Sequence, residues 1–479
     1  MGAAAKLLLP LRFFARCAFI FLTNLLFFTE KPTVDYSRPK PKRNCSFRRM
    51  VAAFFALFLP FFAQAAERAG LLFTPQESMR ARYDVIRRAQ KEILLSTFSV
   101  VPDDAGMALL EELAKKARAG VPTRLLIDGV SHQRDRGKMH DVLLYLQDSG
   151  VEIREFVSQT TSAKLQRAAG LSGFAAEKLH AKVTIGDEIA VSGGRNLNNQ
   201  GLRGPAPGAQ DVDAIFTGEA VSSAKSHLRE LWDSPETQGV KFRQDQISLE
   251  RGRDIVKRAY GWMENAGIVD PDRASDPIKL TKPVKRVHFL HDSAAHVKGP
   301  SPTAMGLQSL FAGAKEEVLV SNHTLNLTQG FWKAFGQARK NGAQVNLLTN
   351  AEDRYPGGAK EGRWASYVKS YRRLAGEGIN LREHRDRASL HAKVAVIDGE
   401  RAVISSFNLE PASEYLNKET AVVIEDRKLA QDLKSYVGRH YGTARQVVEN
   451  GKLIAEAPAK FKVDCGTAFH YLQLLRGFR

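Results

Sequence analysis

Residues 180–187 read His-Ala-Lys-Val-Thr-Ile-Gly-Asp, and residues 391–398 read His-Ala-Lys-Val-Ala-Val-Ile-Asp. Both stretches fit the pattern HxKxxxxD, and the second begins 211 residues after the first. A Ser-Gly-Gly-Arg-Asn run follows the first stretch at 192–196, and a Ser-Ser-Phe-Asn run follows the second at 405–408. The sequence therefore predicts a duplicated framework in which each copy carries one HxKxxxxD box.

The residue types in the two boxes suit attack on a phosphodiester, whose negatively charged oxygens repel nucleophiles. Lysine ammonium groups can neutralise that charge, and asparagine amides can donate hydrogen bonds to it. Histidine can attack phosphorus to form a covalent phosphohistidine, or exchange protons with the alcohols, because its ordinary pKa lies near neutrality. The predicted catalytic set is His180, Lys182, Asn196, His391, Lys393 and Asn408. This chemistry needs no metal ion, and the sequence after residue 66 shows no convincing set of His, Cys and Asp with metal-ligand spacing.

Each box is predicted to lie on a strand followed by a turn. In 179–185 and 390–397 the histidine and lysine are two residues apart, and so project from one face of a strand. Gly193, Gly194 and Ser406 then mark positions where the backbone can closely approach a phosphate oxygen.

The repeat extends beyond the boxes. An order of helix, apolar strand, helix and apolar strand in 77–128 recurs in 303–350, most clearly in the passages AGVPTRLLID and NGAQVNLLTN. Apolar strands that alternate with amphipathic helices indicate an α/β fold with a mixed or parallel sheet. We predict two homologous domains at 67–235 and 284–479, joined by a charged helical linker at 236–283.

These motifs resemble the phospholipase D superfamily, in which two HxKxxxxD boxes form a single active site for phosphodiester chemistry. The resemblance covers most of the chain after residue 70 and implies two domains packed pseudo-symmetrically around one shared site. SGGRNLNN at 192–199 and SFNLEPASEYLNKE at 406–419 are similar to the box tails of bacterial cardiolipin synthases of the C type. The resemblance thus implies phosphatidyl transfer on phospholipids such as phosphatidylglycerol and phosphatidylethanolamine, without a cofactor.

The resemblance also implies roles for individual residues. His180 is the expected nucleophile, and His391 is the expected general acid and base. Asp211 and Glu419 match the family acids that hydrogen-bond the two histidines.

Three further aspartates are assigned differently. Asp213, on the same strand face as Asp211, remains an alternative to it as a histidine partner. Asp187 and Asp398 close the two boxes and are expected to fix the turn after each strand rather than to react.

Two features depart from the family pattern. Gly194 stands where the second box has Ser406, so only one hydroxyl is available at this position. Arg363 and Trp364 stand where related synthases place a histidine and an aromatic residue. This second segment is expected to contribute to the acceptor pocket, and the acceptor, an alcohol or water, stays open.

The net charge of the chain indicates what kind of partner it binds. The 479 residues carry a formal net charge of +18, of which residues 1–66 supply ten basic and two acidic groups, leaving +10 for 67–479. This excess suits an anionic membrane surface or nucleic acid. Of the three cysteines only Cys465 follows residue 66, which excludes an intradomain disulfide and a Cys-rich zinc site there.

The N-terminal region carries targeting features. Basic residues precede an apolar run at 50–62 that ends in Ala-Gln-Ala-Ala, as in a signal peptide cleaved after Ala65. A membrane anchor that includes the apolar stretch 7–28 is the alternative, and Met50 is an alternative start. We expect an exported or inner-membrane-associated protein of the bacterial cell envelope.

A second function fits the same chemistry, since a superfamily nuclease or exonuclease would apply it to a nucleic-acid backbone. Such a protein is expected to place aromatic side chains beside a basic groove, and the candidate here is Trp364 with Arg363, Arg372 and Arg373. A scaffold without activity is disfavoured, because both boxes retain His, Lys and Asn. A monomer suffices for a complete site.

Overall fold

The computed structural model describes residues 67–159, 177–203, 209–240, 242, 245–268, 275–295, 298–351, 367 and 370–455. Within these, residues 133–138 are described by their backbone alone. The predicted targeting region 1–66 and the predicted acceptor segment around Arg363 and Trp364 lie outside the described residues. Among the helices that the structure does describe, none is long and apolar enough to cross a membrane.

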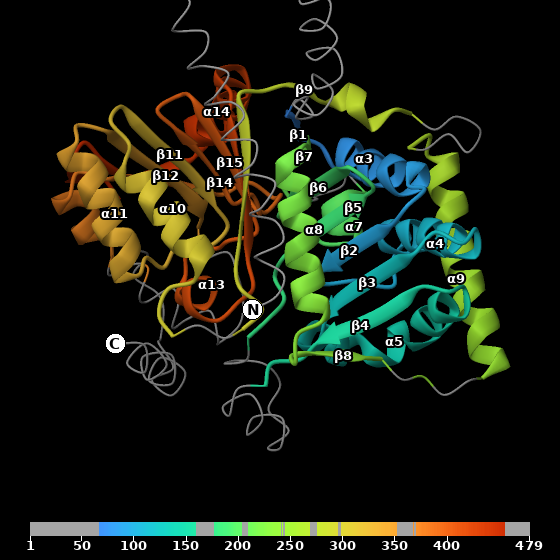
Figure 1. Cartoon of the computed structure of the whole chain (residues 1–479). Coiled ribbons are helices and arrows are strands. Elements are labelled where there is room, and N and C mark those ends of the chain that lie inside the picture. Colours follow the sequence, from blue (N-terminus) through green and yellow to red (C-terminus); the bar gives the residue numbers. More distant parts are fainter. Residues whose placement is uncertain are drawn as a thin grey trace, which may run out of the picture. The chain divides into compact units, whose positions relative to one another are not determined.

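The first half of the chain forms a mixed sheet with the described strand order β8-β4-β3-β2-β5-β6-β7-β1-β9 (Figure 1). Its strands are β1 (Arg68–Leu72), β2 (Ile93–Thr97), β3 (Thr123–Asp128), β4 (Glu152–Phe156), β5 (Val183–Gly186), β6 (Ile189–Gly193), β7 (Asp213–Thr217), β8 (Thr237–Gly239) and β9 (Lys282–Pro283). Its helices are α3 (Pro75–Arg88), α4 (Asp104–Arg118), α5 (Gly129–Asp148), α7 (Asn199–Leu202), α8 (Glu219–Trp232) and α9 (Gln246–Asn265), with a 3₁₀ turn at Pro277–Leu280.

The second half forms another mixed sheet, with the described order β10-β16-β15-β14-β11-β12-β13-β17-β18. Its strands are β10 (Arg286–His291), β11 (Glu317–Asn322), β12 (Gln344–Asn350), β13 (Asn380–His384), β14 (Val394–Ile397), β15 (Arg401–Ser405), β16 (Thr420–Glu425), β17 (Arg445–Glu449) and β18 (Lys452–Leu453). Its helices are α10 (Pro302–Ala312), α11 (Gln329–Lys340), α13 (Pro411–Tyr415) and α14 (Arg427–Thr443).

The two sheets repeat one plan. From β8 the first sheet continues through β4, β3, β2, β5, β6, β7 and β1, and from β17 the second continues through β13, β12, β11, β14, β15, β16 and β10. The central pairs β2–β3 and β11–β12 are both parallel, and the box strands β5 and β14 are both antiparallel to their neighbours. Ile93 lies opposite Gly186 as Val318 lies opposite Ile397, so the two boxes hold equivalent places. The predicted α/β fold of two homologous units, each a mixed sheet flanked by helices, is confirmed.

Local sequence explains where these elements begin. The first helix expected in 77–128 begins earlier, at Pro75, because the side chain of Thr74 caps it and Glu77 completes a reciprocal capping box. The first apolar strand expected in 77–128 is β2, in which every residue is buried. A strand covered on both faces reads as a continuous apolar run, which is why its period of two is hidden in the sequence.

The described apolar core has three main parts. One lies between the first sheet and its outer helices, and another lies between the second sheet and its outer helices. The third contains apolar residues of both sheets together with residues of α8 and α14. In β2, Leu94 faces this shared core while Ile93 and Leu95 face the outer core of the first half. The two halves therefore share one continuous hydrophobic interior.

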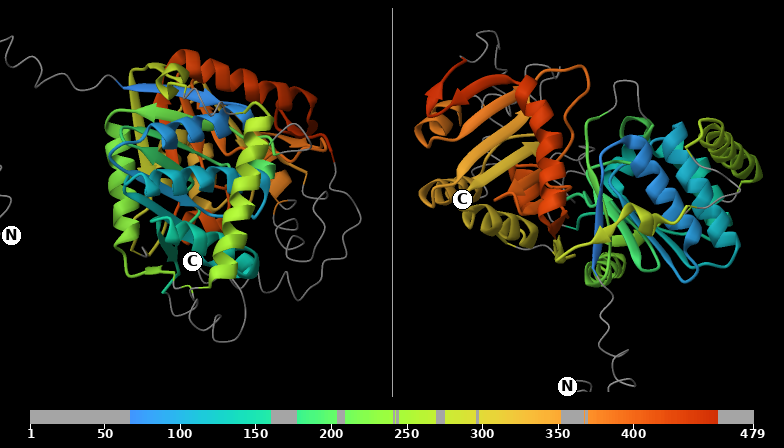
Figure 2. Two further views of the ribbon diagram at one scale, coloured as in Figure 1. Left: turned by 90° about the vertical axis from the view of Figure 1, so that its right-hand side faces the viewer. Right: turned by 90° about the horizontal axis from the view of Figure 1, so that it is seen from above.

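The segment expected to link the halves, 236–283, contributes directly to the first half. Its helix α9, yellow-green in Figure 2, packs against α4 and α5. Val256, Ala259, Tyr260 and Met263 of α9 are buried in the outer core of the first half. The apolar positions recur at helical spacing, so α9 buries one face although its overall composition is charged. This helix is thus part of the first half's core rather than a connector alone.

The close packing of α9 on α5 depends on Gly252. A Cβ atom at this position would stand 2.0 Å from the carbonyl oxygen of Asp141, whereas one at Gly261 of the same helix would meet nothing within 4 Å. We predict that Gly252→Ala lowers the free energy of unfolding by roughly 1–3 kcal/mol, because the helices must separate.

Gly261→Ala is the matched control and should raise stability by up to about 1 kcal/mol through helix propensity. Urea and thermal unfolding of both variants measure the difference. Equal midpoints for the two variants would contradict the described packing of α9.

Candidate active site

The segments that carry the two histidines leave their own sheets and pair with the opposite half. The backbone N–H of His180 donates to the carbonyl of Lys418 at 2.9 Å, and that of His391 donates to the carbonyl of Gln210 at 2.7 Å. Isolated parallel bridges accompany both contacts. Each partner residue directly precedes one of the two predicted acids. The exchange therefore brings each histidine to the acid of the other half.

His180 contacts Glu419, which belongs to the second half. Nδ1 of His180 lies 2.8 Å from Oε2 of Glu419, whose carboxylate is fully buried. Ser406, Ser413 and Asn417 donate side-chain hydrogen bonds to the same carboxylate at 2.5, 2.7 and 3.2 Å. Burial raises the pKa of Glu419, and these donors together with a nearby ammonium group counter that rise. The carboxylate is held in one orientation by contacts on both oxygens.

His391 contacts Asp211, which belongs to the first half. Nδ1 of His391 lies 2.6 Å from Oδ2 of Asp211, and the backbone N–H of Val212 donates to Oδ1 at 2.9 Å. Burial alone would raise the pKa of Asp211, but His391, Lys393 and Arg195 together hold it well below its ordinary value. Asp211 is therefore an ionised partner for the imidazole.

Asp213, the alternative partner, lies in a different cluster. Its carboxylate pairs with Arg82 at 2.9 Å and with Arg195 at 3.3 Å, and it accepts a short hydrogen bond from Ser78. Both arginines are almost completely buried, as is Asp213 itself. Asp211, and not Asp213, is the residue that contacts a histidine. The buried ion pairs instead brace the backbone behind it, since Arg195 also donates to the carbonyl of Asp211.

The two lysines lie beside the histidines of their own boxes. Nζ of Lys182 donates to the carbonyl of His180 at 2.5 Å. Nζ of Lys393 donates to the carbonyl of His391 at 2.6 Å and lies 3.1 Å from its Nε2. The regular strands begin only at the next residues, at Val183 and Val394, because the residues before them bend to the opposite half.

Both ammonium groups lose part of their proton affinity at this site. Burial and the charge of Lys393 lower the pKa of Lys182 to about 7, although Glu419 opposes the shift. Burial lowers the pKa of Lys393 to about 8, although Asp211 and Glu419 oppose it. Close to neutral pH each lysine is thus near its own titration point.

The two imidazoles differ in their surroundings. Burial, followed by the charges of Lys182 and Lys393, lowers the pKa of His180 well below its ordinary value. Burial and Lys393 also lower the pKa of His391, but Asp211 raises it through both charge and hydrogen bonding. The ionised Asp211 therefore offsets part of the shift at His391 and favours its protonated form.

The asparagines occupy equivalent places after β6 and β15. The side-chain oxygens of Asn196 and Asn408 are buried, and neither has a hydrogen-bond partner among the described residues. The amide nitrogen of Asn408 donates to Glu410 at 3.2 Å.

The small residues Gly193 and Gly194 make room for carboxylates. A Cβ atom at Gly193 would stand 2.0 Å from Oδ1 of Asp213, and one at Gly194 would stand 2.7 Å from both carboxylate oxygens of Asp211. The equivalent position in the second half, Ser406, uses its hydroxyl to hold the acid there. The side-chain space at these positions is taken up by packing around the acids, and the expected backbone approach to a phosphate stays a prediction. The Gly/Ser difference between the boxes follows from two different ways of holding a carboxylate.

The aspartates that end the boxes lie away from the histidines. Asp187 accepts backbone hydrogen bonds from Gln90, Lys91 and Glu92 at 2.8–3.1 Å. Asp398 accepts the equivalent bonds from residues 315–317 at 2.8–3.3 Å. Both aspartates have positive φ, of 48° and 53°. They tie the turn after the box strand to the segment that enters β2 or β11.

Two positions that sequence reasoning missed support the backbone beside the histidines. The carboxylate of Asp128 accepts from the backbone N–H of Leu179 at 2.8 Å, and the amide oxygen of Asn350 accepts from that of Leu390 at 2.8 Å. Burial raises the pKa of Asp128 to about 6. The signal was present, because Asp128 and Asn350 end the two passages that match most clearly between the halves.

A further equivalent pair distinguishes the two histidines. The ring of Phe98 packs edge-on against His180, with centroids 5.0 Å apart, and the ring of His323 packs against His391 at 5.0 Å. Phe98 and His323 each follow the central strand of their sheet, β2 or β11, by the same interval. The apolar neighbour of His180 and the polar neighbour of His391 add to the asymmetry of the site.

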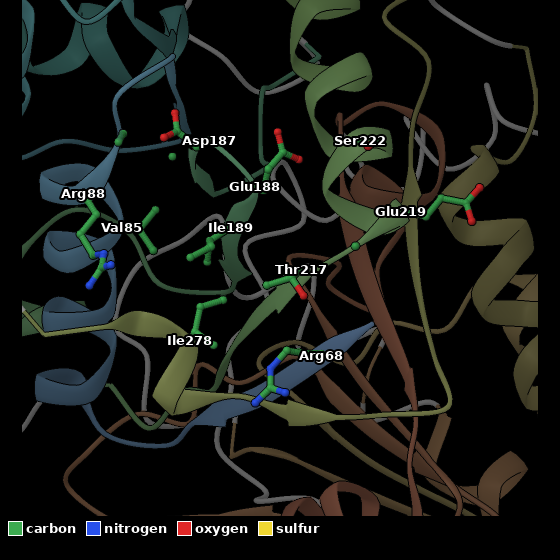
Figure 3. Close-up of a pocket in the computed structure, with 13 residues that line it drawn as sticks. Arg68, Val85, Arg88, Asp187, Glu188, Ile189, Thr217, Glu219, Ser222 and Ile278 are labelled. Carbon is green, nitrogen blue, oxygen red and sulfur yellow. The ribbon is translucent and has the colours of Figure 1, made fainter. Parts of the chain in front are cut away.

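A cavity of about 830 Å³ opens at the other end of the first sheet (Figure 3). Arg68, Arg88, Asp187, Thr217 and Glu219 are among its lining residues. The lining includes neither histidine of the boxes and neither lysine. The cavity is therefore separate from the candidate active site.

Comparison with known proteins places the chain in a family. Residues 83–232 and 307–441 match the family model described as cardiolipin synthase, PLD-like domain. Cardiolipin synthase B of Salmonella typhi is 27% identical over 359 residues, covering 74% of this chain and 75% of that protein. Cardiolipin synthase C of Escherichia coli K12 is 25% identical over 427 residues, covering 81% and 88%.

Among solved structures, the phosphatidylserine synthase of Haemophilus influenzae Rd KW20 has a TM-score of 0.59 at 14% identity, covering 87% of this chain and 96% of that one. At this identity the likeness concerns the fold. The family model matches more than half of the chain and includes both boxes, so the chain belongs to the cardiolipin synthase PLD-like domain family.

Proposed function

We propose that this protein is a phosphatidyltransferase of the phospholipase D type that acts on phospholipids in the manner of a cardiolipin synthase. The observation that carries the proposal is the reciprocal pairing of His180 with Glu419 and of His391 with Asp211, with one lysine beside each histidine. Two oriented imidazoles and two ammonium groups around one position are what transfer through a covalent intermediate requires. The synthases B and C among the relatives agree with a lipid phosphodiester as substrate.

In the first step, the lone pair on Nε2 of His180 attacks phosphorus. The bond from phosphorus to the leaving alcohol breaks, and protonated His391 gives its proton to the departing oxygen. Lys182 and Lys393 oppose the negative charge of the phosphate oxygens. The product is a phosphatidyl group on His180 and a free alcohol.

In the second step, neutral His391 removes the proton of the incoming alcohol as its oxygen attacks phosphorus. The P–N bond breaks and its electron pair returns to Nε2 of His180, while His391 ends protonated as it began. With phosphatidylglycerol as both donor and acceptor, the products are cardiolipin and glycerol. Water in place of the alcohol would give phosphatidic acid.

The assignment of the two histidines rests on their surroundings. His180 has its pKa lowered the more strongly and has Phe98 against its ring, which favours the neutral form that a nucleophile needs. His391 has the ionised Asp211 on Nδ1, which favours the protonated form that a general acid needs. The Nδ1 contact of each histidine turns its Nε2 toward the reacting phosphate.

The first prediction concerns the substrate. Vesicles that contain phosphatidylglycerol should yield cardiolipin, detected by lipid mass spectrometry, and addition of a chelator should leave the reaction in place because lysines supply the charge stabilisation. The rate should fall with added salt, because residues 67–479 carry a formal charge of +10 and bind the anionic surface electrostatically.

His180→Ala is the control for contaminating activity. If the protein turns over no lipid but cleaves single-stranded DNA, its function is that of a nuclease with the same chemistry. Strict dependence on added magnesium or zinc would contradict the mechanism itself.

The second prediction concerns the nucleophile. With a phosphatidyl ester of p-nitrophenol as substrate, His391→Ala should accumulate the covalent intermediate. Nitrophenolate leaves without a general acid, whereas the second step lacks its general base. We expect a burst of about one nitrophenol per protein and a phosphatidyl group on the peptide that contains His180. Each single histidine variant should lose several orders of magnitude in turnover of natural lipid.

The matched variant His180→Ala should give no burst. A burst from His180→Ala with the label on His391 would reverse the two roles.

The third prediction concerns pH. The charged forms of Lys182 and Lys393 are lost as pH rises through their pKa values of about 7 and about 8. Because kcat/KM reports the free enzyme, it should fall at least about tenfold per pH unit above pH 8. The fall in kcat should occur at higher pH, since bound phosphate stabilises the ammonium form.

Lys393→Arg keeps a charge at all these pH values and should make the fall in kcat/KM above pH 8 less steep, because only Lys182 then titrates, even if the maximum is lower. A wild-type kcat/KM that stays constant from about pH 7 to about pH 10 would show that neither lysine titrates as described.

A further inference from the structure

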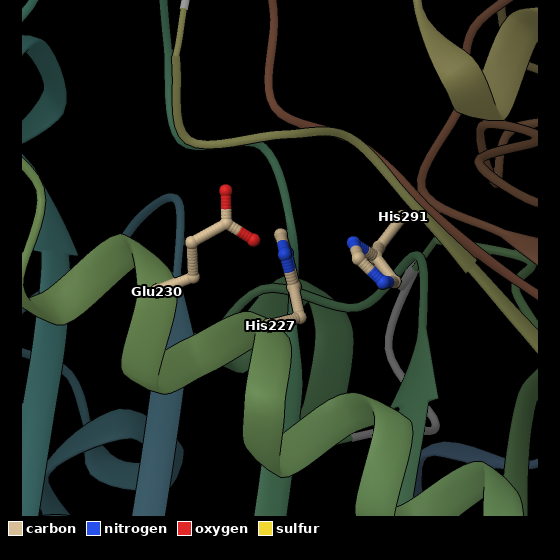
Figure 4. A group of neighbouring side chains, drawn as sticks. All are labelled: His227, Glu230 and His291. Carbon is tan, nitrogen blue, oxygen red and sulfur yellow. The ribbon is translucent and has the colours of Figure 1, made fainter. Parts of the chain in front are cut away.

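Two histidines and a glutamate from different halves converge outside the candidate active site. His227 and Glu230 lie on successive turns of α8, and His291 is the last residue of β10 (Figure 4). Their potential ligand atoms all lie within 4.8 Å of one another, and the imidazole centroids are 4.5 Å apart. Sequence spacing does not reveal this set, because α8 belongs to the first half and β10 to the second.

His227 is the unusual member of the cluster. Its side chain is fully buried, and neither ring nitrogen has a hydrogen-bond partner among the described residues. A buried imidazole that forms no hydrogen bond leaves polar atoms unsatisfied, at a cost of about 1–3 kcal/mol for each. An imidazole nitrogen that coordinates a metal ion is satisfied, so a cation bound by the cluster would account for one of the two nitrogens of His227 that lack a partner.

The other two members, Glu230 and His291, can each offer a ligand atom, and the carboxylate of Glu230 is held in place by hydrogen bonds. Oε1 of Glu230 accepts hydrogen bonds from Ala294 at 3.0 Å and from Ser293 at 3.2 Å, which orient the carboxylate. His291 is partly exposed, so an ion could enter from solvent on this side. Hydrogen bonds that orient a ligating carboxylate are a usual feature of protein metal sites.

We propose that His227, Glu230 and His291 form a binding site for a divalent transition-metal ion of the zinc class. Two imidazoles and one carboxylate match the ligand preference of Zn²⁺, with a fourth position left for water. Ligand atoms in a tetrahedral zinc site lie about 3.4 Å apart, so small side-chain rotations would close the present cluster onto an ion. Hard cations such as Mg²⁺, which prefer oxygen ligands, do not fit this set.

The ion would join the two halves. Because α8 and β10 come from different halves, coordination would cross-link them directly beside the shared apolar core, where the ring of His227 packs against Phe289. The next residue, Asp292, accepts the backbone N–H of Glu419 at 2.9 Å, so the site is connected to the acid that contacts His180. The nearby ammonium of Lys418 opposes the binding of a cation, and its ion pair with Glu177 at 3.7 Å reduces that opposition.

Calorimetric titration with Zn²⁺ alone tests the proposal on the untagged, chelator-treated full chain. We expect one equivalent to bind, and Glu230→Gln and His291→Ala should each weaken binding at least about tenfold. Because Zn²⁺ would bind the folded state alone, saturation of one site should raise the Tm of the wild type by roughly a few degrees. The Tm of these two variants should not rise. Co²⁺ in place of Zn²⁺ should give the intense visible absorption of a tetrahedral site.

Two controls separate this site from other histidines. His288 lies on the same strand, β10, and its ring contacts Glu425. The variant His288→Ala should therefore bind Zn²⁺ like the wild type. The double variant His180→Ala, His391→Ala should also keep its single equivalent. The proposal is overturned if the wild type shows no saturable binding at micromolar Zn²⁺, or if binding survives in His291→Ala and disappears in the double variant.

Discussion

Each box histidine is held by a hydrogen bond to an acid from the opposite half, and the rest of the site depends on this exchange. The histidine segments pair with residues 418 and 210, directly before Glu419 and Asp211. The shared apolar core holds the two sheets in the position that this pairing needs. Neither half contains a box histidine together with the acid that orients it. The geometry of the site therefore depends on how the two halves pack.

The duplicated framework still produces an asymmetric site. In the first half, Gly194 leaves room for the carboxylate of Asp211 and Arg195 holds its backbone carbonyl, whereas in the second half hydroxyl and amide donors hold the carboxylate of Glu419. The rings beside the histidines differ as well, since Phe98 packs against His180 and His323 packs against His391. The asymmetry gives the proposed nucleophile and the proposed proton carrier the distinct environments that their roles require.

Much of the fold was predictable because its signals are local. Apolar runs and the repeated boxes locate β2, α4 and their counterparts within a few residues. The resemblance identified Asp211 and Glu419 as the acids, but their pairing across the two halves was not predictable, since strand periodicity does not state which acid lies opposite which histidine. Asp211 lies two residues before Asp213, the first residue of β7, and the fold brings a histidine to one and arginines to the other. The charged composition of 246–265 likewise hid the buried face of α9, and the cluster at His227 depends on contacts between the two halves.

The reciprocal contacts also have a consequence for biosynthesis. While the chain is being made, the first half emerges with His180 lacking its carboxylate and Asp211 lacking its imidazole. The interior that α8 shares with the second half is then also uncovered. A nascent or truncated chain thus holds no oriented histidine and has apolar surface that marks it for chaperones and proteases. Under the proposed function, reactivity toward phosphodiesters would begin only once the second half has folded against the first.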